Sequence, residues 1–309
     1  MLSRPLFRFV HDDRKIDFMR GRHAGLIISA VLSIASVILF FAPGLNLGLD
    51  FRGGIIVETH APAPQDPTHI RDLLEKAKID AASVQSFGSP NDIRIAINLP
   101  RGKGSGEEKQ TQTLVDHVKE TLVQAVPDVQ IQRADAVGAS VSSELFRNGM
   151  LALLFSLGMI LIYIWIRFER EFALSAVATL VLDLTKTIGF LALTRIEFDL
   201  VMVAALLTIL GYSTNDKVVV YDRIRENMRK YRSMPFKDLL NLSINETLNR
   251  TLGTSMTVFL AALPLALFGG STLTGFATVM LFGIVVGTSS SIFIAAPLLL
   301  ILERLRGRK

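Results

Sequence analysis

Long apolar runs, separated by charged segments, set the organisation of this 309-residue chain. A helix needs about 20 apolar residues to cross roughly 30 Å of hydrocarbon, and the uncharged run 24–49 predicts a first transmembrane helix. The stretch 251–302 is also uncharged and would be about 78 Å long as one helix, so Phe268-Gly269-Gly270-Ser271 is expected to divide it into two spans. Together with the runs at 149–166, 172–194 and 200–221, the segment 146–302 therefore predicts transmembrane helices two to six.

Basic residues gather on alternate connections, which orients the chain by the positive-inside rule. They are dense in 1–23, between the second and third spans, after the fourth span and in the tail 303–309, whereas the connection between the third and fourth spans has only Arg195. We therefore expect both termini in the cytoplasm. The long basic flank of the first span, with no small-x-small cleavage site after it, predicts an uncleaved anchor. At the cytoplasmic end of the second span, Tyr163, Trp165 and Phe168 are typical of an aromatic belt.

The segment 50–145 has the composition of a soluble domain and alternates strands with helices. Periodicity predicts strands at 54–59, 83–87, 93–99 and 129–137, with helices from Pro67 to Ala77 and at 107–126. The order β-α-β-β-α-β is the split ferredoxin-like pattern. The fold class is thus a polytopic α-helical membrane protein with six spans and a periplasmic α+β domain. The glycine-rich run 102–106 lacks the Gly-Lys-Ser/Thr ending of a P-loop, so we interpret it as a flexible connector and predict no ATP site.

Charged residues inside the third span are the first candidates for function. Asp183 lies about 16 Å into that span, near the bilayer centre, and Lys186 follows at i+3, so that the two can pair. A charge at this depth costs about 2.5–3.5 kcal/mol on insertion scales. Two interpretations stay open: a structural ion pair that orients the helix, and a carboxylate that binds and releases a proton.

The fourth span ends in a polar block that supplies the other candidates. Helical spacing places Asn215, Asp216 and Lys217 deepest, with Asp222 and Arg223 close to the interface. These residues could line a wetted path from the cytoplasm toward the third span. For the two outer residues, anchoring at the membrane surface is an equal alternative.

Two further segments predict packing rather than chemistry. Apolar residues at helical spacing over 235–249 predict an amphipathic cytoplasmic helix lying on the membrane surface, with Asn241, Asn245 and Asn249 opposite. In the sixth span, Gly283 and Gly287 form a GxxxG pattern, which favours close helix packing.

Composition narrows the function classes. The chain has no cysteine, so neither disulfides nor thiolate metal sites are possible. The net charge of +5 comes from residues beside the apolar runs, which indicates topology and lipid contact rather than nucleic-acid binding. All five histidines precede residue 146, outside the later spans. We predict no cofactor, no metal and no enzymatic activity.

Several motifs together resemble one family. They are GLNLGLDFRGG at 44–54, RFE at 167–169, GYSTNDKVVVYDRIREN at 211–227, INETLNRTLGTS at 244–255 and GTSSSIFIA at 287–295. In this order relative to the spans they resemble the SecF family, from the resistance-nodulation-division superfamily of proton-coupled transporters. The resemblance runs from about residue 20 to residue 302.

The resemblance implies an auxiliary subunit of bacterial protein export in the inner membrane. Members pair with SecD into a twelve-helix unit, associate with the SecYEG channel and the SecA motor, and use the proton gradient to promote translocation of unfolded polypeptide. Asp183 matches the third-span acidic position, and Asp216, Asp222 and Arg223 match the fourth-span motif. The chain departs from the family pattern at Leu182, where histidine is common, at Lys186, where an apolar residue is usual, and at Lys217, where a small polar residue is usual.

Two other classes remain open from the sequence. One is half of a proton-coupled exporter of small molecules or lipids from the same superfamily, which would need a partner half. The other is a passive scaffold whose charges are only structural. The coupled ion is either a proton or sodium, because carboxylates and hydroxyls suit both.

Overall fold

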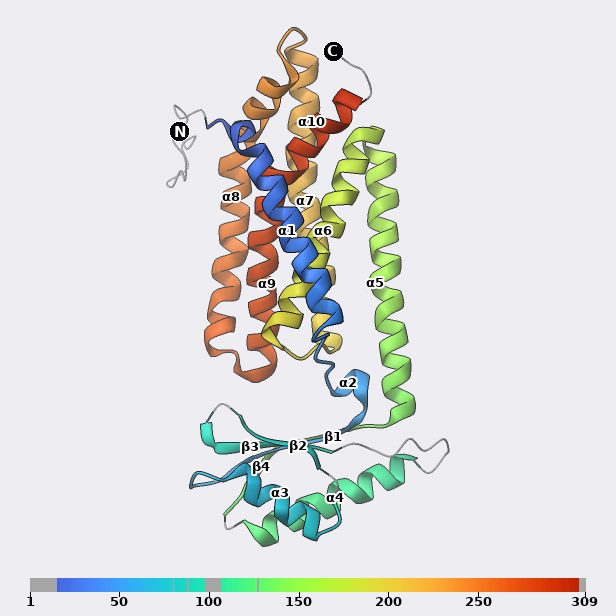
Figure 1. Cartoon of the computed structure of the whole chain (residues 1–309), viewed down its shortest axis with the longest axis vertical. Coiled ribbons are helices and arrows are strands. Elements are labelled where there is room, and N and C mark those ends of the chain that lie inside the picture. Colours follow the sequence, from blue (N-terminus) through green and yellow to red (C-terminus); the bar gives the residue numbers. More distant parts are fainter. Residues whose placement is uncertain (1–15, 80, 88, 98–106, 127, 306–309) are drawn as a thin grey trace, which may run out of the picture. The chain divides into compact units, whose positions relative to one another are not determined.

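The structure is a computed structural model that describes residues 16–79, 81–87, 89–97, 107–126 and 128–305 (Figure 1). The chain forms two compact units. One, formed by residues 1–46 and 152–309, is called here the helical unit, and the other, residues 47–151, is called the small domain. The predictions about the glycine-rich run 102–106, and those about residues 1–15 and 306–309, fall outside the described residues.

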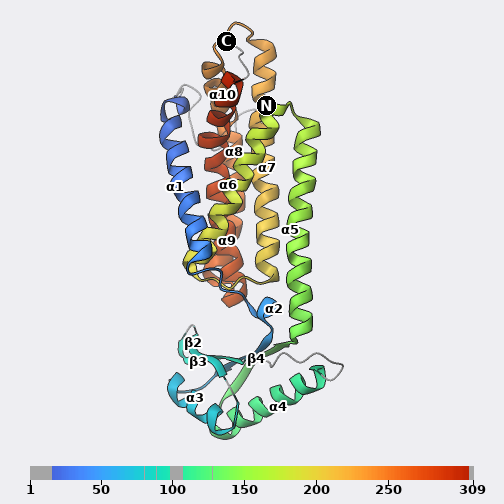
Figure 2. The same cartoon turned by 45° about the vertical axis from the view of Figure 1, so that its right-hand side comes forward.

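Long helices build the helical unit (Figures 1 and 2). After a short 3-10 turn, η1 (Phe18–Gly21), the elements are α1 (Arg22–Phe41), α5 (Ala139–Arg167, which begins in the small domain), α6 (Arg170–Thr194), α7 (Leu200–Lys230), α8 (Phe236–Phe268) and α9 (Gly270–Ser290). A π-helical turn, η2 (Ser291–Ala295), joins α9 to α10 (Ala296–Leu305). The predicted break between the last two apolar runs is confirmed, since α8 ends at Phe268 and α9 begins at Gly270.

Five segments among the described residues are long and apolar enough to cross a membrane. They are Phe18–Phe41, Ala139–Arg167, Arg170–Thr194, Phe236–Phe268 and Leu273–Leu305. Helix α7, in which we predicted the fourth span, is not among them, because the polar block from Tyr212 to Lys217 interrupts its apolar run.

The prediction of a separate amphipathic helix over 235–249 is wrong. One continuous helix, α8, runs from Phe236 to Phe268, and only its first half is amphipathic. The apolar stripe of that half does not lie on a surface: Leu239, Leu240 and Ile244 are each at most 3% exposed and belong to the core of the helical unit. The periodic pattern identified a buried face correctly but not the surface that covers it.

Four antiparallel strands and two main helices form the small domain. A short helix, α2 (Leu49–Arg52), precedes β1 (Gly54–His60), α3 (Pro67–Lys76), β2 (Ala81–Phe87), β3 (Ser89–Ile97), α4 (Glu107–Ala125) and β4 (Gln130–Val137). The order of strands in the sheet is β2-β3-β1-β4. The element order is the predicted one. Alternate residues of β1 and β3 are apolar, as expected for strands that turn one face to the core. Ile55, Val57 and Ile95 are fully buried beneath α3 and α4.

Two glycines join α2 to β1. Gly53 and Gly54 have φ of +71° and +132°, a region that favours glycine. A Cβ on Gly54 would lie 2.6 Å from the carbonyl oxygen of Ile97 in the neighbouring strand. The strand can therefore start beside β3 only if its first residue has no side chain.

Candidate functional site

Three helices of the helical unit meet around one buried carboxylate, that of Asp183 on α6. Lys217 Nζ of α7 lies 2.9 Å from Asp183 Oδ2. Ser213 of α7 and Ser290 of α9 donate hydrogen bonds to the same oxygen, at 2.8 and 2.6 Å. These residues and Lys186 are all at most 6% exposed. We call Asp183, Lys186, Ser213, Lys217 and Ser290 the Asp183 cluster.

Close approach of α9 to α7 brings Ser213 and Ser290 to the same carboxylate. A Cβ on Gly283 would lie 2.4 Å from Cδ1 of Ile209, and one on Gly287 would lie 3.2 Å from Cβ of Ser213. The missing side chains of the GxxxG pattern thus face α7. Because Ser213 and Lys217 are one turn apart on α7, both reach the carboxylate together.

The two oxygens of Asp183 differ in their surroundings. Oδ2 accepts three hydrogen bonds, whereas the buried Oδ1 has no hydrogen-bond partner among the described residues. Lys186 Nζ lies 3.8 Å from Oδ1, too far for a hydrogen bond. The predicted pairing of Asp183 with Lys186 is therefore the weaker contact, and Lys217, from another helix, is the close partner.

Asp216 is a second buried carboxylate, 5% exposed, that directly precedes Lys217 of the Asp183 cluster and interacts with its charge. The hydroxyl-bearing side chains of Ser291 and Thr251 lie next to it. It forms no ion pair with any described residue, and its Oδ2 has no hydrogen-bond partner among them. More hydroxyls connect α7, α8 and α9: Tyr212 donates to Ser255 at 2.8 Å, and the Ser255 and Thr288 hydroxyls are 2.7 Å apart.

The remaining predicted residues lie outside both buried groups. Asn215 is exposed on the surface of the described chain. Asp222 accepts two hydrogen bonds from Arg167 at 3.0 Å each. Arg223 donates to Glu246 at 2.7 Å and to Glu226 at 2.6 Å. Asp222 and Arg223 thus form partly exposed ion pairs that connect α7 with α5 and α8. These ion pairs do not extend the buried groups into a path from the surface.

A short hydrogen-bonded chain lies between these ion pairs and the cluster. Tyr221 of α7, fully buried, donates to Ser175 of α6 at 3.0 Å, and Ser175 donates to the carbonyl oxygen of Ala295 at 2.8 Å. Ala295 is the last residue of the π-helical turn η2. The hydroxyl of Ser175 thus binds the backbone at the end of this π-helical turn.

Phe168 departs from the predicted aromatic belt. It is 6% exposed and packs edge-on against Tyr221, with ring centroids 5.8 Å apart. The guanidinium groups of Arg167 and Arg225 lie 5.1 and 5.6 Å from its ring centroid. Tyr163 and Trp165 are about half exposed, at 53% and 50%.

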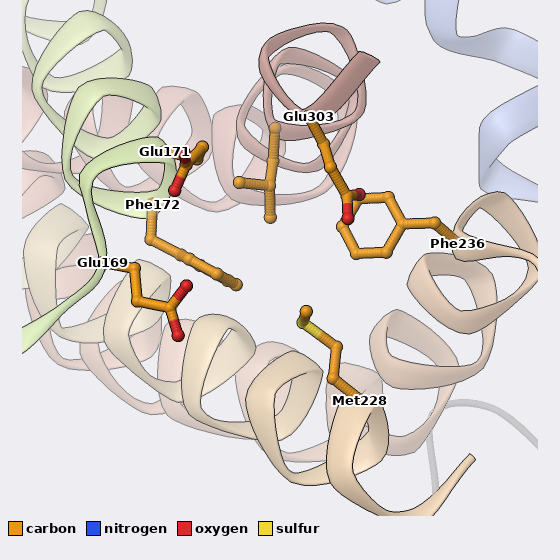
Figure 3. Close-up of a pocket in the computed structure, with 7 residues that line it drawn as sticks. Glu169, Glu171, Phe172, Met228, Phe236 and Glu303 are labelled. Atoms are coloured by element: carbon orange, nitrogen blue, oxygen red, sulfur yellow. The ribbon is translucent and has the colours of Figure 1, made fainter. Parts of the chain in front are cut away.

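A small pocket opens near the ends of α6, α7 and α10 (Figure 3). Its walls combine acidic and apolar side chains, namely Glu169, Glu171, Phe172, Met228, Phe236, Leu299 and Glu303. Figure 3 shows Met228, Phe236 and the carboxylate of Glu303 around the same opening. It is separate from the two buried carboxylates.

Asparagines of α8 hold the segment that precedes α1. Asn245 accepts from the Ile16 amide at 3.0 Å and donates to the Ile16 carbonyl oxygen at 2.9 Å. Asn241 accepts from the Met19 amide at 3.0 Å and donates to Asp17 at 2.7 Å. The Asn241 side chain is the main reason that the pKa of Asp17 lies below its usual value. Asn241 and Asn245 therefore bind the backbone of this segment and the side chain of Asp17.

The residues that sequence reasoning missed are hydroxyls. Ser213, Ser290 and Ser175 each bond to a functional group or to the π turn. Ser213 could have been found from its spacing to Lys217, and Ser290 from the hydroxyl-rich run Thr288–Ser291 that follows the GxxxG pattern. Among the described residues, no group of three His, Cys, Asp or Glu side chains could hold a metal ion.

Comparisons with known proteins agree with this arrangement. The family described as "Protein export membrane protein SecD/SecF, C-terminal" matches residues 117–305, and the "SecD/SecF GG Motif" matches residues 38–61. A protein translocase subunit SecF from Rickettsia bellii is 41% identical over 286 residues, which are 92% of this chain and 92% of that protein. The chain belongs to the SecF family. The paired glycines of the SecF-family motif are Gly53 and Gly54, whose backbone geometry excludes side chains.

Other SecF proteins and a solved SecDF structure match along most of the chain. The SecF of Calditerrivibrio nitroreducens is 40% identical over 97% of this chain and 98% of its own length. The crystal structure of SecDF, a translocon-associated membrane protein from Thermus thermophilus, is 30% identical with a TM-score of 0.83 and covers 96% of this chain. This SecF-family chain spans only 40% of that SecDF chain.

Proposed function

We propose that this chain is an auxiliary subunit of bacterial protein export that pairs with a SecD-like chain and uses an ion gradient. The export role is supported by relatives, named protein translocase subunits, that match over nine-tenths of its length. The SecD-like partner is supported by the match to two-fifths of a SecDF chain. The SecYEG channel, the SecA motor and unfolded polypeptide follow from family resemblance.

We infer six crossings of the inner membrane, with both termini cytoplasmic. Helix α7 has 31 residues, about 46 Å of helix and enough to span the bilayer. Its polar residues Ser213, Asp216 and Lys217 are buried inside the unit rather than presented to lipid, which is where a spanning helix tolerates them. The small domain, whose element order and sheet order fit a ferredoxin-like fold, is then periplasmic.

We assign the coupled ion to Asp216. The observation that carries this assignment is that Asp216 is buried and forms no ion pair with a described residue. The Asp183 carboxylate faces two ammonium groups, so protonating it would leave excess positive charge buried without compensation. Asp216 has hydroxyl neighbours and no ion pair with a described residue. A single proton would make the Asp216 carboxyl group neutral. The group can then be ionised when water reaches it and protonated when it is shielded from water. The geometry supports a structural role for Asp183 and a carrier role for Asp216.

The membrane potential supplies enough energy for ion movement through Asp216 to drive a conformational change. Moving one charge through a potential of 100 mV is worth about 2.3 kcal/mol. Several such transfers can bias a two-state arrangement of subunits, since a complete switch needs about 5.5 kcal/mol.

An export assay with isosteric variants tests this assignment. In cells that depend on this chain, Asp216→Asn is expected to reduce gradient-driven export at least about tenfold, while the chain still accumulates and holds its SecD-like partner. Glu226→Gln is the matched control, because it neutralises a carboxylate of the same helix that is 61% exposed. Normal export by Asp216→Asn in a folded, partnered complex would remove the carrier role.

A further inference from the structure

The face that α1 turns to the interior is made of serines. Of the 20 residues of α1, those that are buried are Ser29, Ser33 and Ser36, at 4%, 7% and 7% exposure. The other faces carry apolar side chains such as Ile27 and Ile34, at 63% and 61% exposure. Serine is common where membrane helices pack closely, so the question is whether each hydroxyl has a hydrogen-bond partner.

The serines divide into one that is satisfied and two that are not. Ser36 donates to the carbonyl oxygen of Leu32 at 2.8 Å and packs directly on Gly189 of α6, where a Cβ would lie 2.2 Å from its hydroxyl oxygen. The hydroxyls of Ser29 and Ser33 are fully buried and have no hydrogen-bond partner among the described residues. Buried polar groups of this kind are usually bonded to protein or to ordered water.

Helix geometry places these hydroxyls at the depth of the Asp183 cluster. Helices α1 and α6 run in the same direction side by side (Figures 1 and 2). Ser36 meets Gly189, and beyond the ends of both helices Asn46 donates to the carbonyl oxygen of Arg195 at 2.9 Å. One turn back from the first contact are Ser33 on α1 and Lys186 on α6, and a further turn back are Ser29 and the level of Asp183.

Four under-bonded polar groups lie on the neighbouring helices α1 and α6 at these levels. The members are the hydroxyls of Ser29 and Ser33, Asp183 Oδ1 and the ammonium of Lys186, which makes no hydrogen bond to a described residue and lies 3.8 Å from Oδ1. A separation of this size invites a bridging water, and a buried water needs two to four polar partners. Donors and acceptors are both present, which suits water better than either an anion or a cation.

We propose that ordered water is held between α1 and α6 by Ser29, Ser33, Lys186 and Asp183 Oδ1. The two oxygens of Asp183 then have separate roles. Oδ2 is bonded by protein groups from α7 and α9, and Oδ1 is bonded by water on the side of α1. This site gives a reason for a lysine at position 186, where the family pattern is apolar, and it makes α1 one wall of a hydrated route to the buried ion pair.

Cysteine labelling tests the site directly, because the chain has no cysteine of its own. In the full chain in its native membrane, Ser33→Cys is expected to react with a small water-soluble methanethiosulfonate at least about tenfold faster than two controls, since a thiolate forms where water reaches it. One control is Ser36→Cys, equally buried but packed on Gly189, and the other is Ile34→Cys, on the apolar face. Adding Lys186→Met should slow the labelling of Ser33→Cys.

Equal rates at positions 33, 36 and 34 would overturn the proposal and leave a dry seam of small residues. If Ser33→Cys does not accumulate, Ser29→Cys is measured against the same controls, and a slow rate there overturns the proposal equally. The inference rests on the proposed insertion of α1 and α6 in the membrane but not on ion coupling. Failure of the labelling therefore leaves the export result for Asp216→Asn standing, and the reverse also holds.

Discussion

The small domain and the helical unit both have an apolar core, but they differ in the polar groups they bury and in the side chains that cover their surfaces. Beneath its sheet the small domain packs aliphatic residues such as Ile55, Val57 and Ile95, and its charges pair near the surface. The helical unit buries Asp183, Lys217 and many hydroxyls, while isoleucines and phenylalanines cover its outside. Water drives the first arrangement. The second fits a unit surrounded by lipid, where apolar side chains gain nothing by moving inward and polar groups must find one another.

Replacing Lys217 with Met gives the largest expected effect. It leaves the Asp183 carboxylate buried beside only the more distant Lys186, and breaking such a buried pair costs about 3–5 kcal/mol. The free energy of unfolding, measured by denaturant titration of the purified full chain, should fall by that amount. The double variant Lys217→Met/Asp183→Asn should recover most of the loss. If it is as unstable as the single variant, the pair is not the source of the stability.

The same aliphatic substitution should distinguish the two regions. Ile95→Ala, at a fully buried position of β3, should cost about 3 kcal/mol through lost burial and a cavity. Ile34→Ala in α1, 61% exposed, should change stability by less than about 0.5 kcal/mol. Hydrogen exchange of β1 and β3 amides, read in the full chain, measures the first effect locally. Equal costs at the two positions would contradict the comparison.

Gly283→Ala probes the close approach of α7 and α9. The new Cβ would lie 2.4 Å from Cδ1 of Ile209, and this overpacking should cost about 1–3 kcal/mol. Gly158→Ala is the control, since nothing lies within 4 Å of its Cβ. The variant Ile209→Val should relieve part of the cost in combination with Gly283→Ala. Additive losses in that double variant would show that the two side chains do not meet.

The smallest effect is expected at the paired charges of the small domain. His60 Nδ1 lies 2.6 Å from Asp92 Oδ1, and this contact holds the pKa of Asp92 below its ordinary value of 3.8. A depressed pKa adds stability above pH 3.8 that is lost as the pH falls through the value in the folded state. Protection of the Ala61 amide, which bonds Asn91, should therefore weaken below that pH. Asp92→Asn should abolish this dependence, and an unchanged profile would contradict it.

The sequence predicted those features that repeat with a period. Apolar runs located the six long helices α1 and α5 to α9 and the break at Gly269, and the alternation in β3 located a strand of the small domain. The sequence pattern failed where the outcome depends on contacts with another helix. The stripe over 235–249 has the period of an amphipathic helix whether lipid or protein covers it, so its burial by the core could not be derived from the pattern.

The site shows the same limit. Local spacing joined Asp183 to Lys186, because residues three apart share a helix face. The closer partner, Lys217, is 34 positions away on another helix, α7. Hydroxyls are too common in the chain to single out Ser213 or Ser290 without the packing of the helices. Polar residues in an apolar run thus identified the right helices but not the right pairs.

The π-helical turn η2 has a geometric consequence for the last ten described residues. One additional residue in a helix turns everything after it by about 100° relative to an uninterrupted α-helix. Leu299 and Leu300 face the interior on a face offset in this way from that of Gly283 and Gly287. Deleting one residue from Ser291–Ala295 would rotate α10 and turn those leucines outward. The turn thus sets the buried face of α10 independently of the buried face of α9, and Ser175 binds the backbone where the two helices join.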